Sequence, residues 1–150
     1  MTVLMKNSQD LLKLDRKRLR EIIEALLVYS KLQDRALSIL FTDNEEIARF
    51  NKKWFGKDSP TNVISFSYLD GFQNEALGDL VISVEKTREE AELSGLPFYE
   101  RLVALVVHGL VHVLGFDHEA GPKEARRMRD RERKLMRHAR ELDAYKEIRL

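Results

Sequence analysis

The sequence of 150 residues contains no cysteine, only three prolines and one tryptophan, and no long run of apolar residues. Without cysteine the chain has no disulfide, no thiolate metal ligand and no cysteine nucleophile. No segment approaches the roughly 18 apolar residues of a membrane-spanning helix, and the first twenty residues lack the apolar block of a signal peptide. We therefore expect a cytoplasmic protein that does not associate with membranes.

The length and composition indicate a single domain in which positive charge is concentrated near the C-terminus. A chain of this length, with 43% hydrophobic residues, buries about 70% of its unfolded surface, so residues 1–150 are expected to form a single domain. The formal net charge is +1, yet the segment 123–150 holds 11 Lys and Arg against 6 Asp and Glu. Such a segment is typical either of nucleic-acid binding or of a solvated helix face with interspersed ion pairs, and the composition leaves both interpretations open.

Hydrophobic periodicity and turn residues predict a mixture of strands and helices. Short strands are expected at 3–5, 36–41, 63–67 and 80–84. Helices are expected at 16–30, 44–50, 85–93, 98–114 and from 122 onward, with a loop at 51–61 and a turn at 78–79. This order predicts an α+β fold in which a small mixed β-sheet packs against helices.

Three of the four histidines fall within eleven residues. On a helix, residues four apart lie one turn above each other, so His108 and His112 share a face and both imidazoles reach one ion. His118 lies too far along the axis of a straight helix, but Gly115 lacks a Cβ and allows a left-handed turn that brings the chain back. The spacing predicts a metal site with three histidine ligands rather than three separate core histidines.

Three imidazoles suit zinc, one ion per chain, with nickel or another divalent metal as the alternative. Three protein ligands leave a fourth position for water, as in catalytic zinc sites. The spacing is also that of the H-E-x-x-H-x-x-G-x-x-H metalloproteases, but Gly109 stands where they keep the glutamate base, so the usual protease mechanism is absent. Asp117 and Glu119 are candidates for a base or for a hydrogen-bond partner of a ligand, or are ordinary turn residues.

Three blocks of the sequence resemble motifs of one known family. Residues 108–118 (HGLVHVLGFDH) resemble the H-G-x-L-H-x-x-G-[YF]-D-H signature of the YbeY family of bacterial metal-dependent endoribonucleases. Residues 51–66 (NKKWFGKDSPTNVISF) are similar to its N-x-x-[YF]-R-G-x-D-x-P-T-[DN]-V-L-S-F block, and residues 77–83 (LGDLVIS) to its L-G-D-I-x-I-S strand. The blocks follow in the family's order, and the match runs from about position 44 to 119.

The resemblance implies a zincin-like metallohydrolase fold and a zinc-dependent endoribonuclease that cuts single-stranded RNA with a metal-activated water. It also implies a role in 3′-end maturation of small-subunit (16S) ribosomal RNA and in ribosome quality control. The implied partners are RNA and the ribosome or its small subunit. By the signature, His108, His112 and His118 carry over as the metal ligands.

One position departs from the family pattern. The arginine of the second block falls at Phe55, which cannot pair with a phosphate as a guanidinium does. Either Lys52, Lys53 or Lys57 supplies positive charge in its place, or the activity is lowered or altered. Trp54 and Phe55 either stack on unpaired bases or form a hydrophobic plug beneath the loop.

Arg126 and Arg127 follow the third histidine and are further candidates for contacts with RNA, while His138 is expected on the surface. Two other functions compete with ribonuclease activity. The same metal chemistry suits an amidase or peptidase, which Gly109 disfavours. A non-catalytic ribosome-assembly factor would hold a structural metal whose fourth coordination position is closed.

Overall fold

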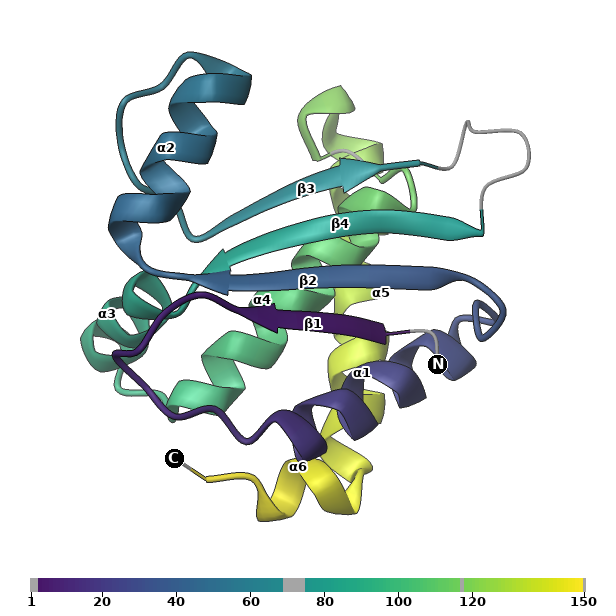
Figure 1. The fold of residues 1–150 in the computed structure, drawn as a ribbon. Coiled ribbons are helices and arrows are strands. Elements are labelled where there is room, and N and C mark those ends of the chain that lie inside the picture. The colour runs from purple at the N-terminus through teal and green to yellow at the C-terminus, as the bar shows by residue number, and fades with distance from the viewer. Residues whose placement is uncertain (1–2, 69–74, 117, 150) are drawn as a thin grey trace.

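A computed structural model describes residues 3–68, 75–116 and 118–149, in which four strands form one mixed sheet with helices on both of its faces (Figure 1). The strands are β1 (Val3–Asn7), β2 (Ala36–Thr42), β3 (Val63–Ser67) and β4 (Ala76–Ser83), in the order β1-β2-β4-β3. β1, β2 and β4 are parallel, whereas β3 pairs antiparallel with β4 at an edge of the sheet. The α+β fold with a small mixed sheet is confirmed.

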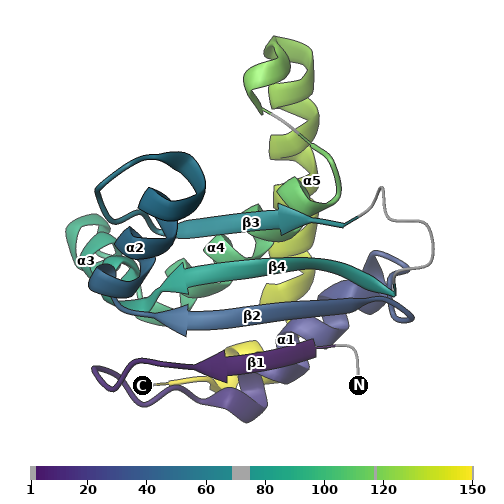
Figure 2. The ribbon, with the colours of Figure 1, turned by 45° about the horizontal axis from the view of Figure 1, so that its top comes forward.

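The helices form two unequal layers. They are α1 (Arg16–Tyr29), α2 (Asn44–Phe55), α3 (Val84–Ser94), α4 (Phe98–Val113), α5 (Pro122–Glu141) and α6 (Asp143–Glu147), with a 3₁₀ turn η1 (His118–Ala120). α1, α4 and α5 lie together on one side of the sheet, as Figures 1 and 2 show from two directions. α2 packs on the opposite face, where Ile47 contacts Ile64 and Val81.

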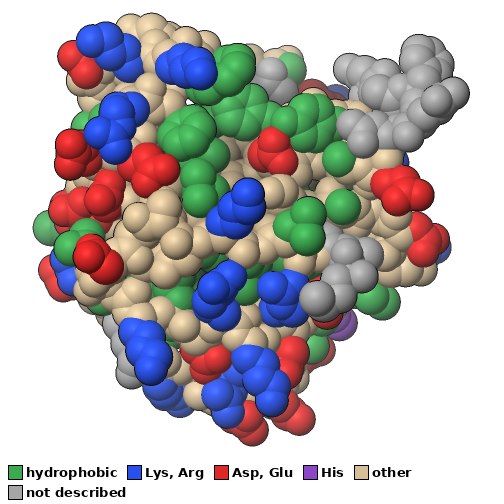
Figure 3. Space-filling view, viewed as in Figure 1, with side chains coloured by type: hydrophobic (Ala, Val, Ile, Leu, Met, Phe, Trp, Pro, Cys, Tyr) green, Lys and Arg blue, Asp and Glu red, His purple; other side chains and the backbone are tan. Residues whose placement is uncertain are grey.

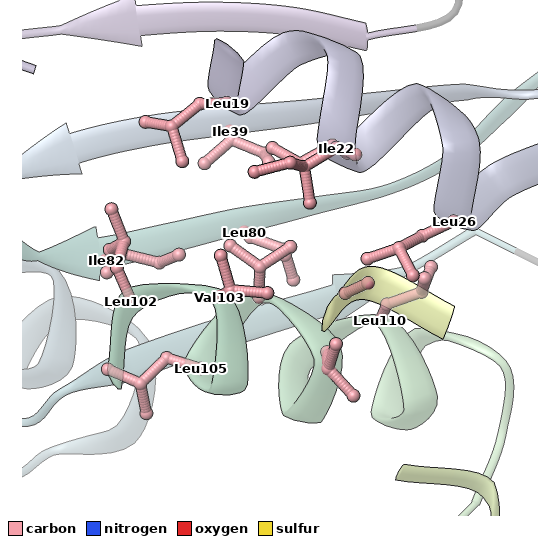
Figure 4. Close-up of a cluster of buried hydrophobic side chains, with 14 of the residues drawn as sticks. Leu19, Ile22, Leu26, Ile39, Leu80, Ile82, Leu102, Val103, Leu105 and Leu110 are labelled. Atoms are coloured by element: carbon pink, nitrogen blue, oxygen red, sulfur yellow. The ribbon is translucent and has the colours of Figure 1, made fainter. Parts of the chain in front are cut away.

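The main core lies between the sheet and the pair α1 and α4 (Figure 4). Ile39 and Leu80 point from the strands toward α1 and α4, because alternate strand residues face the same side. α4 contributes eleven buried residues, and burial of each large apolar side chain stabilises the fold by about 1.5–3 kcal/mol. The helix that carries two of the histidines is therefore firmly anchored.

Side-chain caps begin three of the helices. Asp15, Asp43 and Ser83 each accept a hydrogen bond from the backbone amide three residues later, which satisfies a donor that the first helical turn leaves unpaired. α5 begins at Pro122, whose missing N–H costs nothing at the first helical position. These caps place the helix starts within a residue of their predicted positions.

The predicted end of the second helix is wrong. α2 continues to Phe55, five residues beyond the expected end at position 50, so that residues 51–55 are helical rather than loop. Gly56 then ends the helix in the left-handed region with φ of +69°, and its amide donates to the Lys52 carbonyl. This extra turn carries Trp54 and Phe55 over the sheet.

The predicted turn at 78–79 is also wrong, because β4 already begins at Ala76 and includes both residues. A Cβ at Gly78 would collide with the backbone carbonyl of Phe66 and with the side chain of Val113, whose Cγ1 would lie 2.8 Å away. Gly78 therefore allows β3 and α4 to approach β4 closely, and it does not serve a turn.

Two further observations concern the helices. Among the described helices, none is alone long and apolar enough to cross a membrane, and α3 with α4 meets those criteria only as a pair bent by 118°. His138, predicted on the surface, is half-buried in α5 and stacks on Tyr29 with ring centroids 4.4 Å apart. Its ring therefore takes part in the packing of α5 against α1.

Candidate metal centre

The last two turns of α4 place His108 and His112 side by side. Their ring centroids lie 4.7 Å apart, with the ring planes at 81° to each other. Both residues are half-buried, and the side chain of His108 is 35% exposed. Two imidazoles so close together suit a shared ion, which zinc ligands approach to about 2.0–2.1 Å. The structure thus brings together two of the three predicted ligands.

Gly109 lies between these histidines and faces the sheet. A Cβ at this position would lie 2.7 Å from Cδ2 of the buried Leu80 on β4. The glycine therefore lets α4 pack closely on β4. A larger side chain at this position would meet Leu80 in the core.

Glu132 on α5 supports His108 in a way that the sequence did not predict. Its Oε1 lies 3.0 Å from Nδ1 of His108, and its side chain is 29% exposed. A carboxylate at Nδ1 fixes the orientation of the ring and directs Nε2 toward a metal, an arrangement common among metal-ligating histidines. No local signal in the sequence links Glu132 to a residue 24 positions earlier.

The segment after α4 leaves the helix as predicted. Gly115 has φ of +95°, its amide donates to the His112 carbonyl, and the amide of Phe116 donates to the Val111 carbonyl. The chain then forms η1, which begins at His118. Asp117 and the side chain of His118 lie outside the described residues, and among the described side chains no three His, Cys, Asp or Glu residues could hold a metal ion together.

The end of β3 is attached to the same end of α4. Ser67 Oγ donates to the carbonyl of Val113 at 2.7 Å, one residue after His112. The hydroxyl of Tyr68 donates to the carboxylate of Asp79. This hydrogen bond, assisted by burial and by the negative charge of Asp79, raises the pKa of Tyr68, so the hydroxyl remains a donor at neutral pH.

The predicted RNA-contacting loop lies partly on α2. Lys52, Lys53 and Lys57 are all exposed, and the Lys53 ammonium lies 5.3 Å from the Trp54 ring. Trp54 is 56% exposed and Phe55 52% exposed, yet both rings contact Phe66 on β3, with centroids 5.7 and 6.2 Å apart. The rings therefore combine a packed edge with an open surface, and both predicted roles remain compatible with this geometry.

These aromatic rings border a groove on the open face of the sheet, which we call the aromatic groove. Its volume is about 740 Å³, and its lining includes Phe50, Trp54, Phe55, Phe66, Tyr68 and Asp79. Figure 3 shows hydrophobic side chains gathered beside α2 on this face. Ser67 and Tyr68 also line the aromatic groove, and Ser67 is the residue that bonds the carbonyl of Val113 at the end of α4.

Arg126 and Arg127 lie in the first turns of α5, and both are exposed. Arg127 pairs with Glu124 at 2.7 Å, and its guanidinium lies 5.7 Å from the ring of Phe116. This contact places one cationic side chain next to the segment that leads to the third predicted ligand. Glu119, the alternative base, is exposed in η1.

Comparisons with known proteins identify relatives over nearly the whole chain. A family model described as Endoribonuclease YbeY matches residues 4–140. A protein named Endoribonuclease YbeY from Syntrophus aciditrophicus is 36% identical over 140 residues, which are 90% of this chain and 88% of that protein. A protein of the same name from Geobacter sulfurreducens is 39% identical over 140 residues, covering 90% of this chain and 93% of that protein.

A solved structure supports the fold independently. The solution structure of a Thermotoga maritima protein matches with a TM-score of 0.67 and 22% identity, covering 92% of this chain and 89% of that one. At this level of identity the similarity concerns the arrangement of strands and helices. It agrees with the mixed sheet and its helical layers.

Proposed function

The chain belongs to the YbeY family of endoribonucleases, and from this membership we propose that it cleaves single-stranded RNA in 3′-end maturation of small-subunit (16S) ribosomal RNA. A role in ribosome quality control, in the cytoplasm and with the ribosome or its small subunit as partner, follows from the same resemblance. The observation that carries the proposal is the pair of adjacent histidine rings, one of them supported by a carboxylate at Nδ1.

We infer that one zinc ion is held by His108, His112 and His118, with nickel or another divalent metal as the alternative. The adjacency of the first two rings supports this ligand set, as does the left-handed turn at Gly115 that precedes the third. When bound, such a metal supplies Lewis-acid chemistry, because it polarises a phosphoryl oxygen and acidifies water.

The chain's own residues position this chemistry. Glu132 holds the His108 ring through Nδ1. Asp117, next to the third ligand in the sequence, is our candidate for the group that accepts a proton from water or that orients a ligand, and Glu119 is the alternative. Gly109 contributes no base, and its contact with Leu80 keeps this face of α4 against the sheet.

We assign RNA binding to two sets of cationic side chains. Lys52, Lys53 and Lys57 lie on and after the end of α2, beside the aromatic groove, and all are exposed. Arg126 and Arg127 lie at the start of α5, close to the turn that leads to His118. Phosphate contacts from both sets would hold an RNA strand across the histidine pair.

The decisive experiment combines metal analysis with cleavage of a defined RNA. The purified protein is expected to contain about one equivalent of metal and to cleave single-stranded RNA in preference to a duplex of the same sequence. Chelator should abolish cleavage, and zinc should restore it. His112→Ala should abolish both metal binding and cleavage, whereas His138→Ala, which removes an imidazole outside the site, should retain both.

The same experiment separates the competing functions. Cleavage that continues unchanged in His112→Ala would remove the metal-dependent ribonuclease. Turnover of peptides but not of RNA would favour the amidase or peptidase. Tightly bound metal without cleavage of RNA or peptides, together with a large loss of stability in chelator, would favour the assembly factor with a structural metal.

A further inference from the structure

α5 carries a second feature that the metal centre does not use. Of its twenty residues, nine are Lys or Arg and four are Asp or Glu. Its buried face consists of Met128, Leu135, Met136 and Ala139, which pack into the core. The cationic side chains lie on the remaining faces of the helix.

Some of these cationic side chains line a groove of about 700 Å³ along α5 and α6, which we call the arginine groove. The positive residues that line it are Arg129, Arg133, Arg137, Arg140 and Lys146. Only two carboxylates, Glu132 and Glu141, oppose them in the lining. The four arginines follow at intervals of four, four and three residues, so they form a row about 16 Å long on one side of the helix.

The ion pairs of this row are few and weak. Arg133 pairs with Asp130 at 3.4 Å and Arg140 with Glu100 at 3.5 Å, and these two arginine side chains are 72% and 53% exposed. Exposed pairs of this kind contribute about 0–1 kcal/mol, so an incoming phosphate can replace them. Arg129 and Arg137 are exposed and form no ion pair with another described residue.

The arginine groove begins beside the candidate metal centre. Glu132 lines the groove, and its Oε1 is the atom that bonds Nδ1 of His108. Arg133, Arg137 and Arg140 follow from this point along α5 toward Lys146 on α6, and Arg129 lies about one turn before it. A strand that reaches the histidine pair therefore finds a continuous series of guanidinium groups along one direction.

We propose that the arginine groove binds the phosphate backbone of the substrate RNA on one side of the cleaved bond, from the histidine pair along α5 toward α6. This inference rests on the proposed function, because it takes the strand at the histidines to be RNA. Guanidinium groups pair with phosphate through two parallel hydrogen bonds, and such contacts are independent of base sequence. The groove would thus set the length of RNA that the protein holds and would not select its sequence.

The test measures binding of a fluorescent 20-nucleotide single-stranded RNA over a range of salt concentrations, in chelator so that the RNA stays intact. Arg133→Gln/Arg137→Gln removes two groups from the row. Because each phosphate contact to a single strand contributes about 0.7 to the salt slope, the slope should fall by about 1.4. At 0.1 M salt this corresponds to a loss of affinity of about 10- to 30-fold.

The matched control is Arg49→Gln/Lys86→Gln, which removes two charges from α2 and α3, to the left of α5 in Figure 1. Its salt slope should stay close to that of the wild type. Thermal unfolding of both variants should match the wild type, since Arg133 is exposed and neither Arg133 nor Arg137 belongs to the buried face of α5. A smaller salt dependence of RNA affinity in the arginine variant alone supports RNA binding by the arginine groove.

The outcomes separate this inference from the proposed function. If the wild type cleaves RNA and the arginine variant keeps the affinity and salt slope of the wild type, RNA binding by the arginine groove is refuted and the proposed ribonuclease function is retained. If the wild type binds RNA through the arginines but does not cleave it, the proposed ribonuclease function is refuted and RNA binding by the arginine groove is retained. Absence of RNA binding by the wild type overturns both. Displacement of RNA by poly-glutamate at equal charge would overturn the assignment to a phosphate backbone.

Discussion

Replacing Glu132 by glutamine is expected to weaken metal binding while leaving the fold intact. The glutamine keeps the size of the side chain and one acceptor oxygen, but it removes the negative charge 3.0 Å from Nδ1 of His108. Loss of a carboxylate that supports a metal-ligating histidine typically lowers metal affinity 10- to 100-fold. This corresponds to about 1.4–2.7 kcal/mol of binding free energy.

The measurement is a competition for zinc between the protein and a chromophoric chelator. Asp130→Asn is the matched control, because Asp130 lies two residues away on α5, is 55% exposed and pairs only with Arg133 among the described side chains. Without metal, both variants should unfold at nearly the temperature of the wild type. With zinc, the stabilisation of Glu132→Gln should be smaller by the lost binding free energy, about 1.4–2.7 kcal/mol at saturation.

A double-mutant cycle with His108→Ala tests whether the effect passes through that ring. Once the imidazole is absent, the glutamine substitution should have no further effect on zinc affinity. Zinc affinity of Glu132→Gln within twofold of the wild type would refute the reasoning. So would an equal loss of affinity in Asp130→Asn, since the effect would then be one of general charge on α5.

Three further changes test other parts of the structure. Gly78→Ala should lower the unfolding free energy in urea by about 1–3 kcal/mol, because the new methyl meets Val113 and a β3 carbonyl; an unchanged midpoint contradicts this. Asp15→Ala removes a helix cap and should cost about 1 kcal/mol at pH 7. Burial alone would raise the pKa of Asp15, but hydrogen bonds from Arg18 outweigh burial and lower this pKa in the folded protein. The stability that the carboxylate contributes is therefore present above the unfolded pKa of about 3.9 and is lost as acid protonates the folded carboxylate. The cost of Asp15→Ala should accordingly shrink as the pH falls below about 3.9. Phe55→Arg restores the family's residue at a half-exposed position and should raise kcat/KM for RNA about tenfold; an unchanged value means that the lysines already replace it.

The elements that the sequence predicted well are those with local signals. The apolar helix α4 and the starts of α1 and α3 depend on residues within a few positions of each other, and each of these helices begins within a residue of its expected position. The adjacency of His108 and His112 follows from helical geometry in the same way. The third ligand stays a prediction, since its side chain lies outside the described residues.

The errors arise where tertiary contacts override local patterns. Gly78 resembles a turn residue, but its role depends on β3 and α4, which come from distant parts of the chain. The last turn of α2 places Trp54 and Phe55 against Phe66, a contact that the loop residues of this segment do not reveal. In the same way Glu132 meets His108 only because α5 packs on α4, so sequence spacing offered no means to pair them.

The composition of α5 is compatible both with nucleic-acid binding and with a solvated helix face, because the different sides of the helix have different roles. The buried face and the row from Arg129 to Arg140 occupy different sides of one helix, and Glu132 lines the arginine groove while it bonds His108, so the helical phase sets the positions of all three together. A shift of one residue turns every side chain by about 100°, which would move Glu132 away from His108 and would carry the arginines toward the core. Packing of Leu135 and Ala139 therefore fixes the position of the carboxylate and the direction of the arginines together. This helical phase places the arginine row next to the histidine pair, so it favours nucleic-acid binding as the role of the basic segment.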